Sequence, residues 1–215
     1  MVKVERSFPE PESLAVEAQK ANGSYSEPDV VGRLREDFHD KCYICEMKNL
    51  QDPQIEHLLP HMGGKYPERK FDWNNLFWSC GHCNSVKNQR KYDEGIIDYC
   101  QEDPEELIWF QLGEKDVRIS AKDKENRRAV LTAELVTEVF NLKNTGMRIY
   151  KSEHRMKELT LEMNKLYASL EEIEENPESQ FALRKVRALL RTESKFAAFK
   201  RCYVRDNVDR YPQLM

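Results

Sequence analysis

The chain has 215 residues, of which 33% are charged, yet its formal net charge is only −4. A chain of this length can bury one good core or two modest ones. No stretch approaches the roughly 18–20 apolar residues of a membrane span, and the N-terminal MVKVERSFPEPESL lacks the apolar core of a signal peptide. We therefore expect a soluble, cytoplasmic protein without a membrane partner.

The first 39 residues are predicted to be an N-terminal helical segment. Val30, Leu34 and Phe38 recur every four residues in SEPDVVGRLREDFHDK, which is the spacing of one face of an amphipathic helix. This helix leads directly into the first of two cysteine pairs.

Four of the six cysteines form these two Cys-x-x-Cys pairs, Cys42 with Cys45 and Cys80 with Cys83. In a reducing compartment this pattern favours a metal over disulfides, and four thiolates can make a closed tetrahedral zinc site that stabilises a fold. The sequence therefore predicts a structural zinc ion. Cys100 and Cys202 are expected to be ordinary buried thiols, and His82, inside the second pair, is expected at the surface.

The segment between the cysteine pairs predicts a strand, a long loop, a second strand and then a helix. Residues 54–59 have the pattern of a short strand that carries Glu56 and His57. Glycines and a proline interrupt residues 61–73, which predicts a loop. A helix is predicted over residues 84–92, so the polar candidates lie at the end of the first strand and at the start of this helix.

These polar residues suit the hydrolysis of a phosphodiester. The reaction needs a base that deprotonates water and positive charge on the phosphate, which a neutral histidine and a divalent cation can supply. His57 fits the base. Glu56 and Asn84 offer oxygen ligands to a cation such as Mg²⁺, which otherwise keeps water and phosphate around it. Asn75 is suited to pinning the long loop through backbone hydrogen bonds, which would orient His57.

Four phrases of the sequence resemble the zinc-containing branch of HNH endonucleases: Cys42-x-x-Cys45, Glu56-His57-x-x-Pro60, Asn75-Leu76 and Cys80-x-x-Cys83-Asn84-x-x-Lys87. That branch has a ββα-metal fold, which binds one catalytic metal between a strand and a helix. Within it, the phrases IEHLLP, KYPE, DWNNL and SCGHCNSVK, the N-terminal PESL and the basic helical tail resemble the HNH nuclease subunits of Septu antiphage systems (PtuB) and their retron-associated relatives. This narrower resemblance covers most of the chain and is strongest over residues 40–91.

The resemblance implies a role for each of three residues. His57 would be the general base, Asn75 the asparagine that orients the loop, and Asn84 the third motif residue and a metal ligand. Two positions depart from the commoner HNH pattern, because Glu56 stands where Asp is frequent and Asn84 stands in place of His. Both replacements keep an oxygen donor, which favours Mg²⁺ or Mn²⁺ over zinc or nickel as the catalytic metal.

Basic residues near these positions are candidates for nucleic-acid contact. Lys87, Arg90 and Lys91 lie in a segment without acids, whereas residues 93–106 carry seven acids and no base. Lys87, on a helix face expected to be exposed, either contacts a phosphate or does nothing specific. His61 either reaches the phosphate or only closes the loop.

From residue 123 onward the sequence predicts helices. Six apolar residues at alternating spacings of three and four make one seam: Met156, Leu159, Met163, Leu166, Leu170 and Ile173. Pro177 ends this helix, and later seams are expected to pack back on it as a helical hairpin, with a partner protein as the alternative. The tail 180–215 carries nine Lys or Arg against three acids, which indicates either contact with phosphates or a solvated helix face.

The expected fold is therefore α+β, with a zinc-stabilised ββα-metal (HNH) module at residues 40–122. The helical segment 1–39 precedes it, and the helical region 123–215 follows it and contacts partner and nucleic acid. The expected function is that of a metal-dependent HNH endonuclease, the effector of a Septu-like antiphage complex regulated by a PtuA-like ATPase subunit. The retron-associated relatives add a reverse transcriptase and its DNA as expected partners. The alternative is a non-catalytic zinc-ribbon module that binds nucleic acid or serves as a scaffold.

Overall fold

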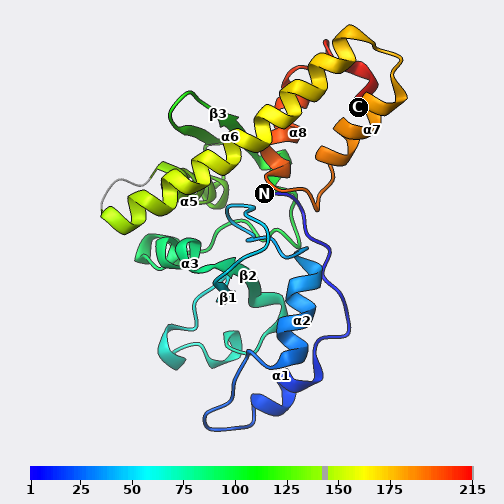
Figure 1. The fold of residues 1–215 in the computed structure, drawn as a ribbon. Helices are drawn as coiled ribbons and strands as arrows, with labels where there is room; N and C mark the ends of the chain where they lie inside the picture. Colours follow the sequence, from blue (N-terminus) through cyan, green and yellow to red (C-terminus); the bar gives the residue numbers. More distant parts are fainter. Residues whose placement is uncertain (142–144, 215) are drawn as a thin grey trace.

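The computed structural model describes residues 1–141 and 145–214, so residues 142–144 and 215 of the predicted C-terminal region lie outside it. The fold is α+β, as predicted (Figure 1), and it contains two small antiparallel sheets. The strands are β1 (Pro53–His57), β2 (Leu76–Cys80), β3 (Ile108–Leu112) and β4 (Val117–Ala121). The α-helices of the described part are α1 (Glu12–Glu17), α2 (Pro28–Asp37), α3 (Gly81–Lys87), α4 (Pro104–Leu107), α5 (Arg127–Asn141), α6 (Gly146–Glu175), α7 (Gln180–Leu189) and α8 (Ala197–Asp206).

The order of strand, long loop, strand and helix between the cysteine pairs is confirmed. β1 pairs with β2 so that His57 lies opposite Leu76 and Pro53 lies opposite Cys80. Three short 3₁₀ turns occupy the connecting loop, and β2 is buried along its whole length. α2 covers this sheet through Phe38, whose ring lies 5.5 Å from that of Phe77.

Helix α3 differs from its prediction at both ends. It begins at Gly81 rather than at residue 84, because Cys80 ends β2 and is also the N-terminal cap of the helix. It ends at Lys87 rather than at residue 92, because Asn88 leaves the helical region with a ψ of 58°. The second cysteine pair therefore lies on the joint between strand and helix.

The hairpin of β3 and β4 was not predicted. Ile108 and Phe110 are buried on one face of β3, whereas Trp109 on the other face is 42% exposed. The hairpin packs against α5 through β4 and against α8 through β3. It therefore packs on the C-terminal helices, although its residues were predicted to belong to the zinc module at residues 40–122.

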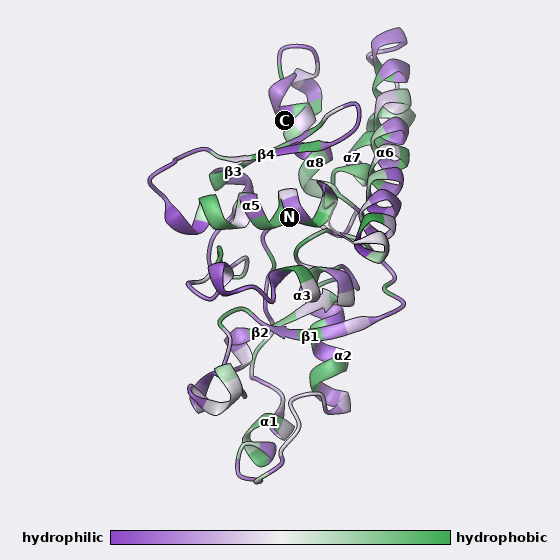
Figure 2. Cartoon of the chain, turned by 90° about the vertical axis from the view of Figure 1, so that its left-hand side faces the viewer, coloured by the Kyte–Doolittle hydropathy of each residue, from purple (hydrophilic) through white to green (hydrophobic). Residues whose placement is uncertain are grey.

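The helical C-terminal region and its apolar seam are confirmed. Leu159, Met163, Leu166, Leu170 and Ile173 are all buried on α6. α7 and α8 pack back on α6, and Figure 2 shows hydrophobic and hydrophilic residues alternating along α6 with α7 beside it. The seam is thus used inside the molecule, as the intramolecular alternative predicted. None of the described helices combines the length and the apolar character that a membrane span requires.

The buried residues form one connected cluster that runs from α2 and β2 through α5 to α6 and α8. Tyr99, which is fully buried, belongs to this cluster, and its ring lies 5.3 Å from that of Tyr43 in the first cysteine pair. The C-terminal helices therefore share a core with the cysteine-bearing region.

Candidate functional site: a four-cysteine centre beside a polar cavity

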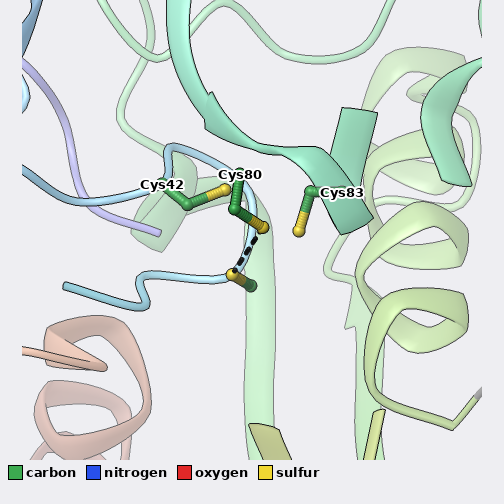
Figure 3. A group of neighbouring side chains, drawn as sticks. Cys42, Cys80 and Cys83 are labelled. Atoms are coloured by element: carbon green, nitrogen blue, oxygen red, sulfur yellow. Dashed lines mark hydrogen bonds between the residues drawn. The ribbon is translucent and has the colours of Figure 1, made fainter. Parts of the chain in front are cut away.

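The four paired cysteines meet at one buried point. Cys42 and Cys45 belong to the turn after α2, Cys80 ends β2, and Cys83 lies in the first turn of α3. Their Sγ atoms all lie within 4.8 Å of one another, and the sulfurs of the three labelled cysteines point toward a common centre (Figure 3). Within the ranges 1–141 and 145–214, no other group of three or more His, Cys, Asp or Glu side chains has this geometry.

This cluster fits a zinc ion. Four sulfurs that are each about 2.3 Å from a central zinc lie about 3.8 Å apart in a tetrahedron. The Sγ atoms of Cys45 and Cys80 are 4.0 Å apart, and all four cysteines are buried and free of disulfide bonds. Four thiolates close the coordination sphere, so the ion would stabilise the fold and leave no position for substrate.

Backbone hydrogen bonds hold Cys42 and Cys45 in a position to bind a metal together. The Cys42 amide donates to the carbonyl of Met47 at 2.9 Å, and the Glu46 amide donates to the carbonyl of Cys42 at 2.9 Å. These bonds close a tight turn in which Glu46 has a positive φ of 57°. The turn directs both thiols of the pair to the same side.

Residues of α5 and α6 also touch the cysteine centre. Arg155 of α6 is buried and donates from one guanidinium nitrogen to Cys80 Sγ at 2.9 Å. His82 was expected at the surface, but it is 2% exposed and its Nε2 lies 3.1 Å from the carbonyl oxygen of Val139 in α5. Burial, with Arg155 nearby, lowers the pKa of His82 to about 4, so this ring is neutral at pH 7.

A second feature, a polar cavity of about 310 Å³, lies between β1, the long loop and α3. Its lining includes five of the residues predicted from the sequence, namely Glu56, His57, His61, Asn84 and Lys87. The cavity differs from the cysteine centre because its donors are oxygen and imidazole groups and because it is open to solvent. The structure thus brings the predicted strand and helix residues to one place.

His57 is presented by the end of β1. Its Nε2 lies 3.0 Å from the carbonyl oxygen of Lys70, and its ring packs against the rings of Tyr25 and His61 at 4.7 and 4.8 Å. A carbonyl can only accept, so Nε2 carries the hydrogen, and Nδ1 of the neutral ring is left as an acceptor. Burial lowers the pKa of His57 below its usual value, which keeps the ring neutral at pH 7.

Asn75 makes the loop contacts expected of it. Its Oδ1 accepts from the Leu59 amide at 2.8 Å, and its Nδ2 donates to the carbonyls of Leu59 and Arg69 at 2.9 Å each. The loop carbonyl that holds the His57 ring belongs to Lys70, next to Arg69. His61 also helps to close this loop, because its carbonyl accepts from the amides of Gly64 and Tyr66 at 3.1 Å each.

Lys87 is not on an exposed helix face. It is 5% exposed, and its Nζ donates to Glu56 at 2.6 Å and to the carbonyls of His57 and Leu58 at 2.9 and 3.0 Å. The other oxygen of Glu56 accepts from the Tyr43 hydroxyl. Lys87 therefore holds the strand end and is not available for a phosphate, in contrast to its expected role in nucleic-acid binding.

The other two basic residues predicted to contact nucleic acid differ in their surroundings. Arg90 is exposed at the start of a 3₁₀ turn, whereas Lys91 forms an ion pair with Glu138 of α5. Most of the basic tail is also paired inside the molecule. The pairs are Lys185 with Glu172, Lys195 with Glu158, Lys200 with Glu162, Arg201 and Arg205 with Glu105, and Arg210 with Glu174.

The cavity lining also includes residues that were not predicted from the sequence. Two of them, Asp93 and Asn88, have side-chain oxygens that could bind a metal ion. Asp93 opens the acidic segment 93–106, which was noted only for its charge. No signal in the sequence separated it from its acidic neighbours, because its place depends on how the chain turns after α3.

No family model matches the chain, and a search of curated proteins finds no significant match. The HNH and Septu resemblance therefore rests on the sequence motifs alone.

Proposed function

We propose that the protein is a metal-dependent HNH endonuclease that hydrolyses phosphodiester bonds of nucleic acid. The observation that carries the proposal is the meeting of His57 and Asn84 at one solvent-open cavity, next to a closed four-cysteine centre. This arrangement separates a structural zinc site from a place where a phosphate can bind. The motifs likewise imply one metal that stabilises the fold and a second metal that takes part in catalysis.

The residues of this chain supply the proton transfer. Nδ1 of neutral His57 is free to accept the proton of a water molecule that attacks phosphorus. Asn75 and the Lys70 carbonyl keep the ring in one orientation through the loop, so the base does not have to be ordered during the reaction.

A divalent cation would supply positive charge to the phosphate and to the departing oxygen. Asn84 faces the cavity with a side-chain amide that has no hydrogen-bond partner among the described residues, so its oxygen is free to bind Mg²⁺ or Mn²⁺. Glu56, the other expected ligand, would have to share its oxygens with Tyr43 and Lys87.

The biological setting follows from the resemblance to Septu nuclease subunits. A nuclease with an open cavity would damage its own host, so its activity is expected to be gated by assembly. We propose a PtuA-like ATPase as the partner, with nucleic acid as the substrate and an antiphage role for the complex.

The proposal is tested by a cleavage assay on the zinc-loaded chain, alone and with a PtuA-like ATPase subunit. Single- and double-stranded DNA and RNA are offered in Mg²⁺, in Mn²⁺ and without divalent cation. We expect metal-dependent cleavage of at least one substrate by the complex and weak cleavage by the isolated chain. Absence of cleavage under all these conditions contradicts the proposal.

One observation favours a second candidate, a non-catalytic zinc-ribbon module that binds nucleic acid or a partner. The oxygens of Glu56 are already bonded to Lys87 and Tyr43, as in a purely structural ion pair. This candidate predicts tight zinc and binding of nucleic acid without any cleavage, so the same assay separates the two.

A further inference from the structure

Two of the basic residues predicted to contact nucleic acid are engaged within the molecule. Lys87 and Lys91 each form an ion pair with a glutamate, so neither can hold a phosphate without giving up its partner. The long loop between β1 and β2 carries three further bases, Lys65, Arg69 and Lys70. This loop borders the polar cavity, so its bases lie closer to the candidate site than the basic tail does.

The charged group of Arg69 is held at the border of the cavity. Its Nη1 donates to the carbonyl of Pro60 at 3.2 Å, and Pro60 is part of the cavity lining. Its guanidinium carbon lies 3.9 Å from the centre of the Tyr66 ring, so the cation rests against an aromatic face. Lys70 differs, because its ammonium is directed away to the carbonyl of Gly23 at 3.0 Å.

The positive charge of Arg69 is only weakly neutralised. Among the described residues it pairs with Glu68 alone, with Nε and Oε1 4.0 Å apart, and the Glu68 side chain is 68% exposed. An exposed pair at this distance is weak. A guanidinium has five N–H groups, and the bond to Pro60 uses one of them. The Arg69 side chain is 29% exposed, so solvent reaches it and a phosphate could too.

The same stretch of the loop positions His57. The Arg69 carbonyl accepts from Asn75 Nδ2 at 2.9 Å, and the carbonyl of the next residue, Lys70, lies 3.0 Å from His57 Nε2. The guanidinium and the imidazole are therefore fixed by adjacent peptide units. Each strand of a nucleic acid carries a phosphate about every 3.4 Å of helix axis, so a substrate with its scissile phosphate at His57 also places phosphates at the border of the cavity.

We infer that Arg69 binds a backbone phosphate that flanks the scissile one. The inference rests on the proposed function and names a phosphate-binding residue of the same site. Tyr66 is its positioning residue, because the ring holds the planar guanidinium in one orientation before the substrate arrives. A guanidinium can bind two phosphate oxygens at once, and one that is already ordered loses less freedom on binding. A contact to phosphate reads no base, so it serves DNA and RNA alike.

Binding of labelled DNA and RNA oligonucleotides to the zinc-loaded full chain tests this inference. Fluorescence anisotropy without added Mg²⁺ or Mn²⁺ gives the Kd at several salt concentrations. Arg69→Met should weaken binding by about tenfold, since it removes a charge-assisted contact. It should also reduce the slope of log K against log salt by about 0.7–0.9, the value for one phosphate contact. Arg69→Lys should weaken binding but keep the slope, because an ammonium retains the charge and loses the planar fork.

The matched control is Arg118→Met, which removes the same charge from an exposed position on β4 and should leave the Kd and the slope unchanged. Tyr66→Leu alters no charge and should weaken binding in the wild type but not in Arg69→Met, because the two side chains act as a unit. Zinc content and denaturant unfolding show whether each variant is folded. If Arg69→Met does not fold, Arg69→Lys and Tyr66→Leu provide the test.

Three results overturn the inference. They are wild-type affinity in a folded Arg69→Met, or in both substitute variants if it does not fold; an equal loss in Arg69→Met and Arg118→Met; and no binding of either oligonucleotide by the wild type. Failure of the proposed function gives a different result. Arg69-dependent binding without cleavage in Mg²⁺ or Mn²⁺ upholds the phosphate contact and removes the nuclease. Cleavage with unchanged Kd and KM in Arg69→Met upholds the nuclease and removes the phosphate contact.

Discussion

His57 depends on residues that lie well away from it in the sequence. The strand pattern and the motif placed His57 at a strand end, and the structure adds the carbonyl of Lys70 and the ring of Tyr25, which hold the imidazole. The sequence could not predict these contacts, because they form only when the loop folds back over the strand. Asn75, which closes that loop, could be predicted from its place before the second cysteine pair.

Replacement of Asn75 tests how the loop is held. Asn75→Ala removes three hydrogen bonds to the backbone of Leu59 and Arg69. We expect the free energy of unfolding to fall by about 1–3 kcal/mol, since each such bond contributes about 0.5–1.5 kcal/mol and some groups regain water. Denaturant unfolding measures this. Asn74→Ala is the control, because the exposed Asn74 side chain bonds to Asp72 alone among the described residues, at 3.4 Å. Equal stability of the two variants contradicts this role.

Replacement of a single thiol tests the zinc centre. Cys80→Ser removes one of four ligands and the acceptor of Arg155. Because metal binding contributes to the folding free energy, we expect loss of bound zinc and loss of a cooperative thermal transition. Zinc content measured by mass spectrometry checks this, with Cys100→Ser, outside the cluster, as the control. A Cys80→Ser protein with full zinc and normal stability would refute the four-cysteine assignment.

At the scale of elements, predictions succeeded where one face of an element is buried over many residues. The repeat on α6 extends over five turns and could be recognised without any neighbour. The hairpin of β3 and β4 has strands of only five residues, and the elements that cover it, α5 and α8, come later in the chain. β1 and β2 are equally short, but the cysteine pairs and the Glu56-His57 motif mark their place in the sequence, whereas no motif marks β3 and β4. The predicted start of α3 was wrong because the helix begins directly after Cys80 of the second cysteine pair. Its predicted end was wrong because the backbone of Asn88 leaves the helical conformation.

The contact of α6 with the four-cysteine centre gives a prediction for Arg155. Four thiolates around Zn²⁺ carry a net charge of −2, and the buried Arg155 guanidinium lies against one of them. Arg155→Met should weaken zinc binding by about 10–100-fold, the usual range for groups that contact metal ligands. Competition with a chelator measures the change. Lys157→Met, an exposed position on the same helix, should bind zinc normally. Equal zinc affinity in both variants would show that α6 does not support the centre.

At the scale of the molecule, the charges of the C-terminal tail are used internally. The tail stood out because its bases outnumber its acids, yet most of the bases pair with acids of α6 and with Glu105. Sequence composition shows an excess of charge but not the partner of each charge. The tail is therefore a weaker candidate for phosphate contact than its composition indicated, and Arg90, near the cavity, remains exposed.

The C-terminal helices and the cysteine-bearing region share one core, which limits the surfaces on which a partner protein could dock. The C-terminal half was predicted to bind the ATPase, but its helices already cover the cysteine centre through His82 and Arg155. Glu46 of the first cysteine turn also accepts from the Ala198 amide at 3.0 Å. Removal of residues 123–215 would therefore expose the zinc region as well as delete a docking surface. The proposed ATPase partner would have to bind to faces that remain exposed, so point substitutions on those faces test docking better than a deletion does.

His57 is proposed as the base of a nuclease, and the cleavage activity of His57→Ala measures this role directly. The zinc-loaded variant is compared with the wild type and with His154→Ala, which alters an exposed histidine on α6, each in complex with the ATPase. We predict that His57→Ala loses activity by about 10²-fold or more, as expected for removal of a general base, while zinc content and assembly stay normal. Undiminished cleavage by His57→Ala would contradict it.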